Sequence, residues 1–85
     1  MALTNLKIKS APVGERHHDG RGLYLTLSAP GRGKWTTRYM MKLKVTEIGL
    51  GRYPELPLAD ARKKHFEARI LIAEGKDPLT ERRKL

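Results

Sequence analysis

The chain of 85 residues is predicted to fold as an α+β domain. We expect a three-stranded antiparallel sheet packed on one face by a single C-terminal helix, with a short N-terminal turn or helix. Three observations lead to this prediction. Residues 23–42 hold two stretches in which apolar and polar residues alternate, as in half-buried strands. From Leu58 the apolar residues recur with a period near 3.6, as in a helix. Between these parts, the segment GLGRYPELPLADAR (residues 49–62) contains two glycines and two prolines, which end the strand and allow the helix to begin.

The three strands are assigned from the side chains that share a face. In residues 23–29, LYLTLSA, the three leucines face one side. In residues 34–42, KWTTRYMMK, the core set is the one that carries Trp35 and Tyr39, because these two types bury the most area. Residues 45–50 form a third strand, and short connections make the three strands an antiparallel meander.

The ends of the domain are less regular. Thr4 is placed to cap one helical turn before Pro12. Residues 13–22 are predicted to be a loop, with a brief strand as the alternative. The helix from Leu58 runs for about 17 residues and stops at Gly75. Residues 79–85 are then either a linker or the start of a second helix.

The charge indicates the class of partner. Residues 1–53 hold ten Lys or Arg and three acids, a net charge of +7, whereas the whole chain carries +9. A one-sided cationic excess is typical of proteins that bind a polyanion, most often nucleic acid. The alternative is a domain that is basic only for solubility. The chain has no cysteine and no apolar run long enough to span a membrane, so we expect a soluble intracellular protein without disulfides.

The residues do not predict an enzyme. His17 and His18 are adjacent and lack a second ligand pair, so a solvated loop is preferred to a metal site. The serines and threonines lack a nearby base, and the two Gly-Arg-Gly segments lack the spacing of phosphate-binding loops. We predict no catalytic residue, no metal and no cofactor.

The face of the sheet opposite the helix is the candidate site. It carries hydroxyl groups, cations, Met40 and one acid, Glu47. A sheet can enter the major groove of DNA, which is about 12 Å wide, and Arg, Thr and apolar groups can read base edges there. Cations near the strand ends are placed to contact phosphates. The predicted DNA-binding residues are Tyr24, Thr26, Arg32, Lys34, Thr36, Arg38, Met40, Lys42, Lys44 and Arg52. An ordinary solvated sheet face is the alternative.

Four motifs, in order, resemble a known family. They are DGRGLYLTL (Asp19–Leu27), KWTTRY (Lys34–Tyr39), LGRYPELPLADAR (Leu50–Arg62) and GKDP (Gly75–Pro78). The chain resembles the N-terminal arm-type DNA-binding domain of phage and genomic-island tyrosine recombinases, the integrases. The resemblance implies double-stranded DNA as the partner, with arm-type sites bound through the exposed sheet face. It places the module in DNA integration and recombination in the cytoplasm of a bacterial host cell.

The resemblance also implies how the chain is divided. Residues 1–78 would be the arm-type domain, and residues 79–85 the start of a linker to an absent core-binding and catalytic domain. Strand cleavage in this family belongs to that other domain, so the chain is predicted to be non-catalytic. The alternative function is a protein-interaction module that docks other recombinase subunits through the sheet edge and the helix. RNA is a weaker third option, because the free face lacks a pair of exposed aromatic residues.

Overall fold

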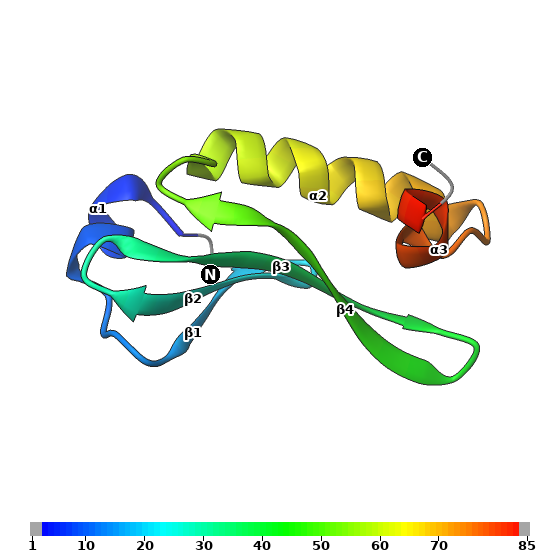
Figure 1. Ribbon diagram of the computed structural model, residues 1–85, viewed down its shortest axis with the longest axis horizontal. Coiled ribbons are helices and arrows are strands. Elements are labelled where there is room, and N and C mark those ends of the chain that lie inside the picture. Colours follow the sequence, from blue (N-terminus) through cyan, green and yellow to red (C-terminus); the bar gives the residue numbers. More distant parts are fainter. Residues whose placement is uncertain (1–2, 84–85) are drawn as a thin grey trace.

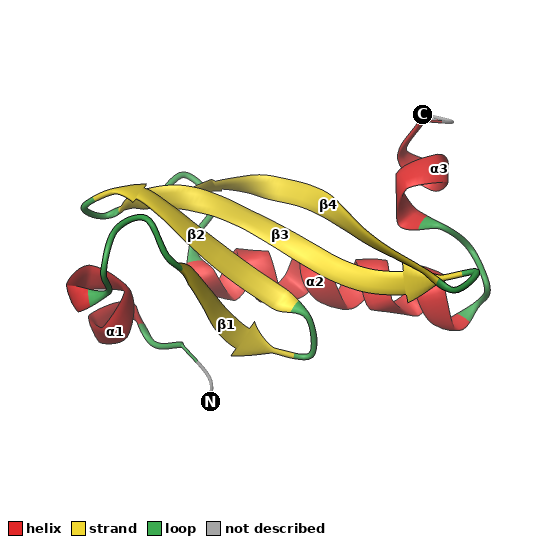
Figure 2. Cartoon of the chain, turned by 90° about the horizontal axis from the view of Figure 1, so that it is seen from below, coloured by secondary structure: helices red, strands yellow, loops and turns green. Residues whose placement is uncertain are grey.

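The computed structural model describes residues 3–83, which form an α+β domain with a four-stranded antiparallel sheet (Figure 1). The elements are, in order, α1 (Asn5–Ser10), β1 (Arg16–Gly20), β2 (Leu23–Ala29), β3 (Arg32–Met41), β4 (Lys44–Tyr53), α2 (Leu58–Ala73) and α3 (Pro78–Arg83). The strands lie side by side in the order of the sequence. The long helix α2 lies along one face of the sheet. Seen from below, the sheet lies in front of α2, and its other face is uncovered (Figure 2).

The prediction of three strands was wrong, because β1 forms a fourth strand at one edge of the sheet. Its sequence, RHHDG, has no apolar alternation, so nothing in its own pattern marks a half-buried strand. It is held by antiparallel pairing with β2, in which Arg16 faces Thr26 and His18 faces Tyr24. The brief strand given above as the alternative is therefore correct for this segment.

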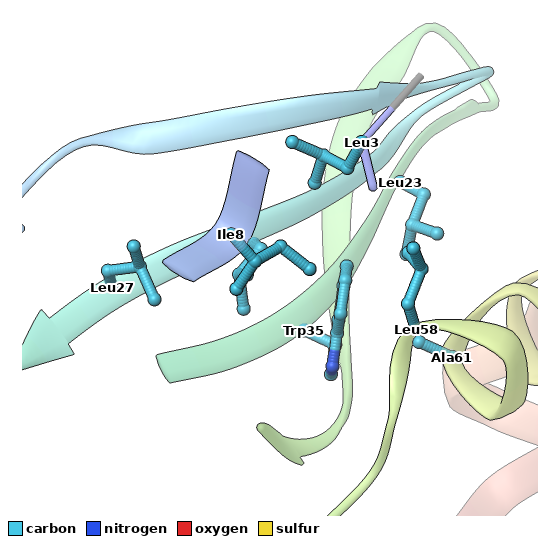
Figure 3. Packing of buried hydrophobic residues seen from close by; sticks show 8 residues of the cluster. Leu3, Ile8, Leu23, Leu27, Trp35, Leu58 and Ala61 are labelled. Carbon is cyan, nitrogen blue, oxygen red and sulfur yellow. The ribbon is translucent and has the colours of Figure 1, made fainter. Parts of the chain in front are cut away.

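The predicted core face is confirmed for the middle strands. The leucines of β2 are fully or almost fully buried, as are Trp35 and Thr37 of β3. Figure 3 shows the indole of Trp35 between Ile8 of α1 and Leu27 on one side and Leu23 of β2 with Leu58 and Ala61 of α2 on the other. Ile8 of α1 packs into the same cluster and is 1% exposed. The sheet face that carries Trp35 is thus covered by α2 and α1 together.

The corner between β4 and α2 holds Trp35 in place. The indole Nε1 of Trp35 donates a hydrogen bond to the carbonyl oxygen of Leu56 at 2.8 Å, so the largest core side chain has its polar group satisfied. The Leu56 amide in turn donates to the Arg52 carbonyl at 2.7 Å. A Cβ on Gly51 would lie 2.9 Å from the Leu56 side chain, so a glycine is needed at this close approach. Pro57 begins α2 without a side-chain cap.

A single C-terminal helix was also predicted, and the structure adds the short helix α3 after α2. Gly75 has φ +78° and ends α2, with the Lys76 amide donating to the Leu71 carbonyl at 2.9 Å. The Asp77 carboxylate then accepts from the Leu79 amide at 3.0 Å, which caps the first turn of α3. Residues 79–85 were predicted to be either a linker or the start of a second helix, and the structure shows a helix as far as Arg83.

An ion pair ties β1 to α2. The carboxylate of Asp19 accepts from Nε of Arg62 at 3.0 Å and from its Nη2 at 2.9 Å, and the backbone amide of Leu3 donates to the same carboxylate at 2.7 Å. Only 8% of the Asp19 side chain is exposed. The Arg62 hydrogen bond holds the pKa of Asp19 below its usual value, against the opposing effect of burial. This contact joins the edge strand, the N-terminal segment and the helix.

Candidate nucleic-acid interface

The uncovered side of the sheet, here called the outer face, is built by strand alternation. Each residue next to a buried leucine of β2 or next to Trp35 of β3 points away from α2. The antiparallel register then sets these side chains in rows across the strands. The first row is Arg16, Thr26, Lys34 and Arg52; the second is His18, Tyr24, Thr36 and Gly49; the third is Arg38 and Glu47; the fourth is Met40 and Val45. The outer face is the side nearest the viewer in Figure 2.

The predicted DNA-binding residues differ in solvent exposure. Tyr24 and Thr36 are half-buried. The other eight are exposed, namely Thr26, Arg32, Lys34, Arg38, Met40, Lys42, Lys44 and Arg52. Met40, with 61% of its surface exposed, lies opposite Val45, which is 50% exposed. A large apolar pair on the outer face therefore accompanies the cations.

Two of the predicted cations are separated from the others. Lys44 pairs with Met41, which belongs to the helix-side set of β3, so Lys44 points to the side of α2. Lys42 lies in the turn between β3 and β4 with φ +53°. Both line a hollow that also holds the carboxylates of Asp77 and Glu81. The structure therefore does not join Lys42 and Lys44 to the rows of the outer face.

Arg16 is a member of the outer face that the sequence did not reveal, because its strand was assigned to a loop. Its guanidinium lies 4.6 Å from the centroid of the Tyr24 ring, a cation–π geometry. Its Nη1 donates to Glu47 Oε1 at 2.6 Å. Arg16 is on β1 and Glu47 on β4, so the pair runs diagonally over β2 and β3, in the direction of Tyr24 and Thr36.

The threonine near this diagonal has an unsatisfied hydroxyl. Oγ1 of Thr36 is enclosed and has no hydrogen-bond partner among the described residues. A hollow on the outer face is lined by both side chains of the Arg16–Glu47 pair and by Thr36, Thr26 and Lys34. A ligand that separates the pair would open this hollow and reach the hydroxyl groups at its base.

Arg38 is an exposed cation of the outer face with no side-chain partner among the described residues. It lies directly opposite Glu47 in the register, yet Glu47 pairs with Arg16 instead. Within residues 3–83, the guanidinium of Arg38 takes part in no hydrogen bond or ion pair. Its backbone is fixed, because its amide donates to the Gly22 carbonyl at 2.8 Å. Arg38 therefore presents an unoccupied planar donor set, suited to a guanine edge or a phosphate, from a fixed strand position.

Two further findings concern metals and membranes. Between Leu3 and Arg83 there is no cluster of three or more His, Cys, Asp or Glu that could hold a metal ion. No helix in that range is long and apolar enough to cross a membrane.

Comparison with known proteins shows the family of the chain. The family model described as the arm DNA-binding domain matches residues 3–85. The chain is 36% identical over 80 residues to the integrase of Shigella phage Sf6, and equally to the prophage integrase IntS of Escherichia coli K12; each match covers 91% of this chain and 21% of the relative. The integrase of Enterobacteria phage P4 is 40% identical over 62 residues, which cover 71% of this chain and 14% of that protein.

The chain thus spans about a fifth of the length of the Sf6 and IntS integrases. The match to the family model extends over nearly every residue, and it includes all the strands that build the outer face. The chain belongs to the family of arm DNA-binding domains.

Proposed function

We propose that this domain binds double-stranded DNA at arm-type sites by placing its outer face in the major groove. The observation that carries the proposal is the uncovered sheet face with Arg38 unpaired beside hydroxyl and apolar groups. The chain contributes binding and positioning, and a catalytic region elsewhere in a longer tyrosine recombinase would cut the DNA. Its role would then be to support DNA integration and recombination in a bacterial host cell.

The outer face divides into two kinds of contact. Arg38, Thr26 and Thr36 lie toward the middle strands, where base edges would be within reach, and Met40 and Val45 offer apolar contact to thymine methyl groups. Arg16, Arg32 and Arg52 lie toward the edges or ends of the strands, where the phosphates that border a groove would run. The edge cations would supply most of the affinity, and the middle of the face would supply the selectivity.

The test begins with selection of bound duplexes from random DNA. Binding of the wild-type domain and of Arg38→Ala is then measured by fluorescence anisotropy on the selected duplex and on a random duplex. If Arg38 reads a base, the substitution weakens selected binding by about 1–3 kcal/mol, roughly five- to 150-fold, and random binding much less. Equal losses on both duplexes would make Arg38 a phosphate contact, and the absence of any selected sequence would refute the proposal.

Salt dependence gives an independent measurement. About four or five phosphate contacts predict that log affinity falls with log salt concentration with a slope near −4. A slope near zero would contradict binding through a cationic surface.

A second candidate function is docking to other recombinase subunits. The observation in its favour is that Phe66 and Ile70, one turn apart on α2, are 63% and 44% exposed. Chemical-shift mapping separates the two functions. Shifts on β2 and β3 upon addition of a duplex support DNA binding, whereas shifts confined to residues 60–75 upon addition of recombinase subunits, with none caused by DNA, support docking.

A further inference from the structure

A cationic hollow lies beside the outer edge of β4, next to the outer face. It is lined by Lys34 of β3, Arg52 of β4, Lys64 of α2 and Arg82 of α3, together with residues 49–51. No Asp or Glu is among its lining residues. We call it the edge hollow. It brings together cations from four elements of the chain, so no local sequence motif could have predicted this hollow.

The positions of two of these cations depend on Gly49. A Cβ on Gly49 would lie 3.2 Å from Cε of Lys34, so the Lys34 side chain passes closely over β4 at this glycine and extends toward the edge. From the other side, Nη2 of Arg82 donates to the Gly49 carbonyl at 2.6 Å. That bond uses one of the five donors of a guanidinium and fixes its location. Both cations are therefore directed to the edge of β4 by contacts at one residue.

The electrostatics of the edge hollow favour an anion. Within the described residues, none of Lys34, Arg52 and Lys64 forms an ion pair. Like charges grouped around one hollow repel each other, and an anion placed among them relieves that repulsion. The β4 edge also adds backbone amide groups that have no neighbouring strand, since β4 is the last strand of the sheet. Cations and backbone amides together are the groups that bind phosphate oxygens.

The edge hollow is continuous with the outer face. Lys34 and Arg52 line both this hollow and the one beneath the Arg16–Glu47 pair. A sheet inserted in a groove presents its edge to the wall of the groove, and that wall is a line of phosphates.

We propose that the edge hollow binds a backbone phosphate of the DNA strand that borders the groove, with Lys64 and Arg82 contributing from the helices. This inference rests on the proposed function, because it takes the outer face as the surface that enters the groove. It makes α2 and α3 part of the DNA-binding surface, whereas the sequence placed the contacts on the strands and their turns. It also predicts that the contact does not depend on base sequence.

The chain offers a matched pair of lysines for the test. Lys64 lines the edge hollow, whereas Lys63, its neighbour on α2, lines none of the hollows described here, and both are exposed. Binding of wild-type protein, Lys64→Gln and Lys63→Gln is measured against salt on the selected and the random duplex. We expect Lys64→Gln to reduce the salt slope by about 1 and to weaken both duplexes by the same factor, because a phosphate contact is lost. Lys63→Gln should leave the slope unchanged.

A second measurement locates the phosphate. Single phosphates along the selected duplex are replaced, one at a time, by uncharged methylphosphonates. At the position that the edge hollow contacts, this replacement should weaken binding of the wild-type protein but should not further weaken binding of Lys64→Gln. Arg52→Gln should be insensitive at the same position. Thermal unfolding checks that each variant remains folded, and if Lys64→Gln is unstable, Arg52→Gln carries the test.

The outcomes separate this inference from the proposed function. Equal slopes for Lys64→Gln and Lys63→Gln would overturn the edge hollow as a phosphate site. So would a loss confined to the selected duplex, which would indicate base reading instead. Neither result would affect the base-reading role of Arg38, which is tested by the ratio of selected to random affinity. If the wild-type domain binds no duplex, both proposals fail.

Discussion

Removal of Arg62 is expected to destabilise the domain more than removal of its partner Asp19. Arg62→Ala leaves a carboxylate that is only 8% exposed without its ion-pair partner. Breaking a buried pair in this way costs about 3–5 kcal/mol, but the Arg62 side chain is 45% exposed, so screening reduces the expected loss to about 2 kcal/mol. In Asp19→Ala, water can hydrate Arg62, and the main effect is that the Leu3 amide loses its hydrogen-bond acceptor. We expect this to lower the free energy of unfolding by about 1 kcal/mol.

Thermal and urea unfolding of the wild type, both single variants and the double variant would measure these values. For a domain of this size 1 kcal/mol corresponds to about 4–8 °C in Tm, so Arg62→Ala should melt roughly 8–16 °C below the wild type. The double variant should be more stable than the sum of the single losses predicts, because it removes the unpaired carboxylate.

The pH dependence follows from the lowered pKa of Asp19. The folded state favours the ionised carboxylate, so the pair stabilises the protein above pH 3.8, and this contribution is lost as the pH falls through the lower folded pKa. The difference between the wild type and Arg62→Ala should therefore shrink below pH 3.8. A larger effect of Asp19→Ala than of Arg62→Ala, or a difference that persists in acid, would refute this reasoning.

Three further predictions concern binding, backbone and core. Glu47→Gln should tighten binding to a random duplex by about two- to fivefold in anisotropy titrations, since DNA no longer has to break the Arg16–Glu47 pair. Asp60→Asn, the same charge change at an exposed position of α2 outside the hollows, should not, and equal gains would show that net charge alone matters. Gly20→Ala should lower the free energy of unfolding, measured in urea, by about 1 kcal/mol, because Gly20 has a positive φ. Gly22→Ala should lower it several times more, because Gly22 also has a positive φ and a Cβ there would lie 2.5 Å from the backbone oxygen of Arg38. Similar losses for the two variants would contradict the clash. Burial lowers the pKa of His65, whose Nδ1 lies 2.9 Å from the Thr37 hydroxyl. Neutral His65 should therefore stabilise the fold above pH 6.5, and this stabilisation should be lost as the pH falls through the lower folded pKa. His65→Gln should flatten this part of the plot of stability against pH, and an unchanged plot would mean that another group causes the pH dependence.

The sequence predicted those parts of the fold in which periodicity and burial agree. Trp35 and Tyr39 were assigned to the core because of their size, and both are buried. His65 lies at the helical spacing of the apolar residues of α2, and it is 7% exposed. The turn residues between β4 and α2 correctly marked where the chain changes direction. In each of these cases the local pattern and the tertiary packing favour the same structure.

The missed parts depend on contacts between distant segments. β1 is stabilised by pairing with β2 and by the Asp19–Arg62 ion pair, which joins residues 43 positions apart. The only signal in its sequence was DG at its end, which is typical of a turn beside a strand. The Arg16–Glu47 pair and the edge hollow likewise need the register of all strands before they can be recognised. Lys44 was grouped with the other predicted DNA-binding cations because it lies near the end of a strand. Successive residues of a strand point to opposite faces, and the pairing of Lys44 with Met41 puts its side chain on the α2 side of the sheet.

The polar edge strand β1 has a consequence for how the domain behaves at high concentration. Without it, β2 would be the end of the sheet, and its run of Leu23, Leu25 and Leu27 would offer unsatisfied amides beside an apolar face. Such an edge invites strand addition from another molecule, the first step of aggregation. Two histidines, an arginine and an aspartate on so short a strand discourage intermolecular pairing at this edge of the sheet.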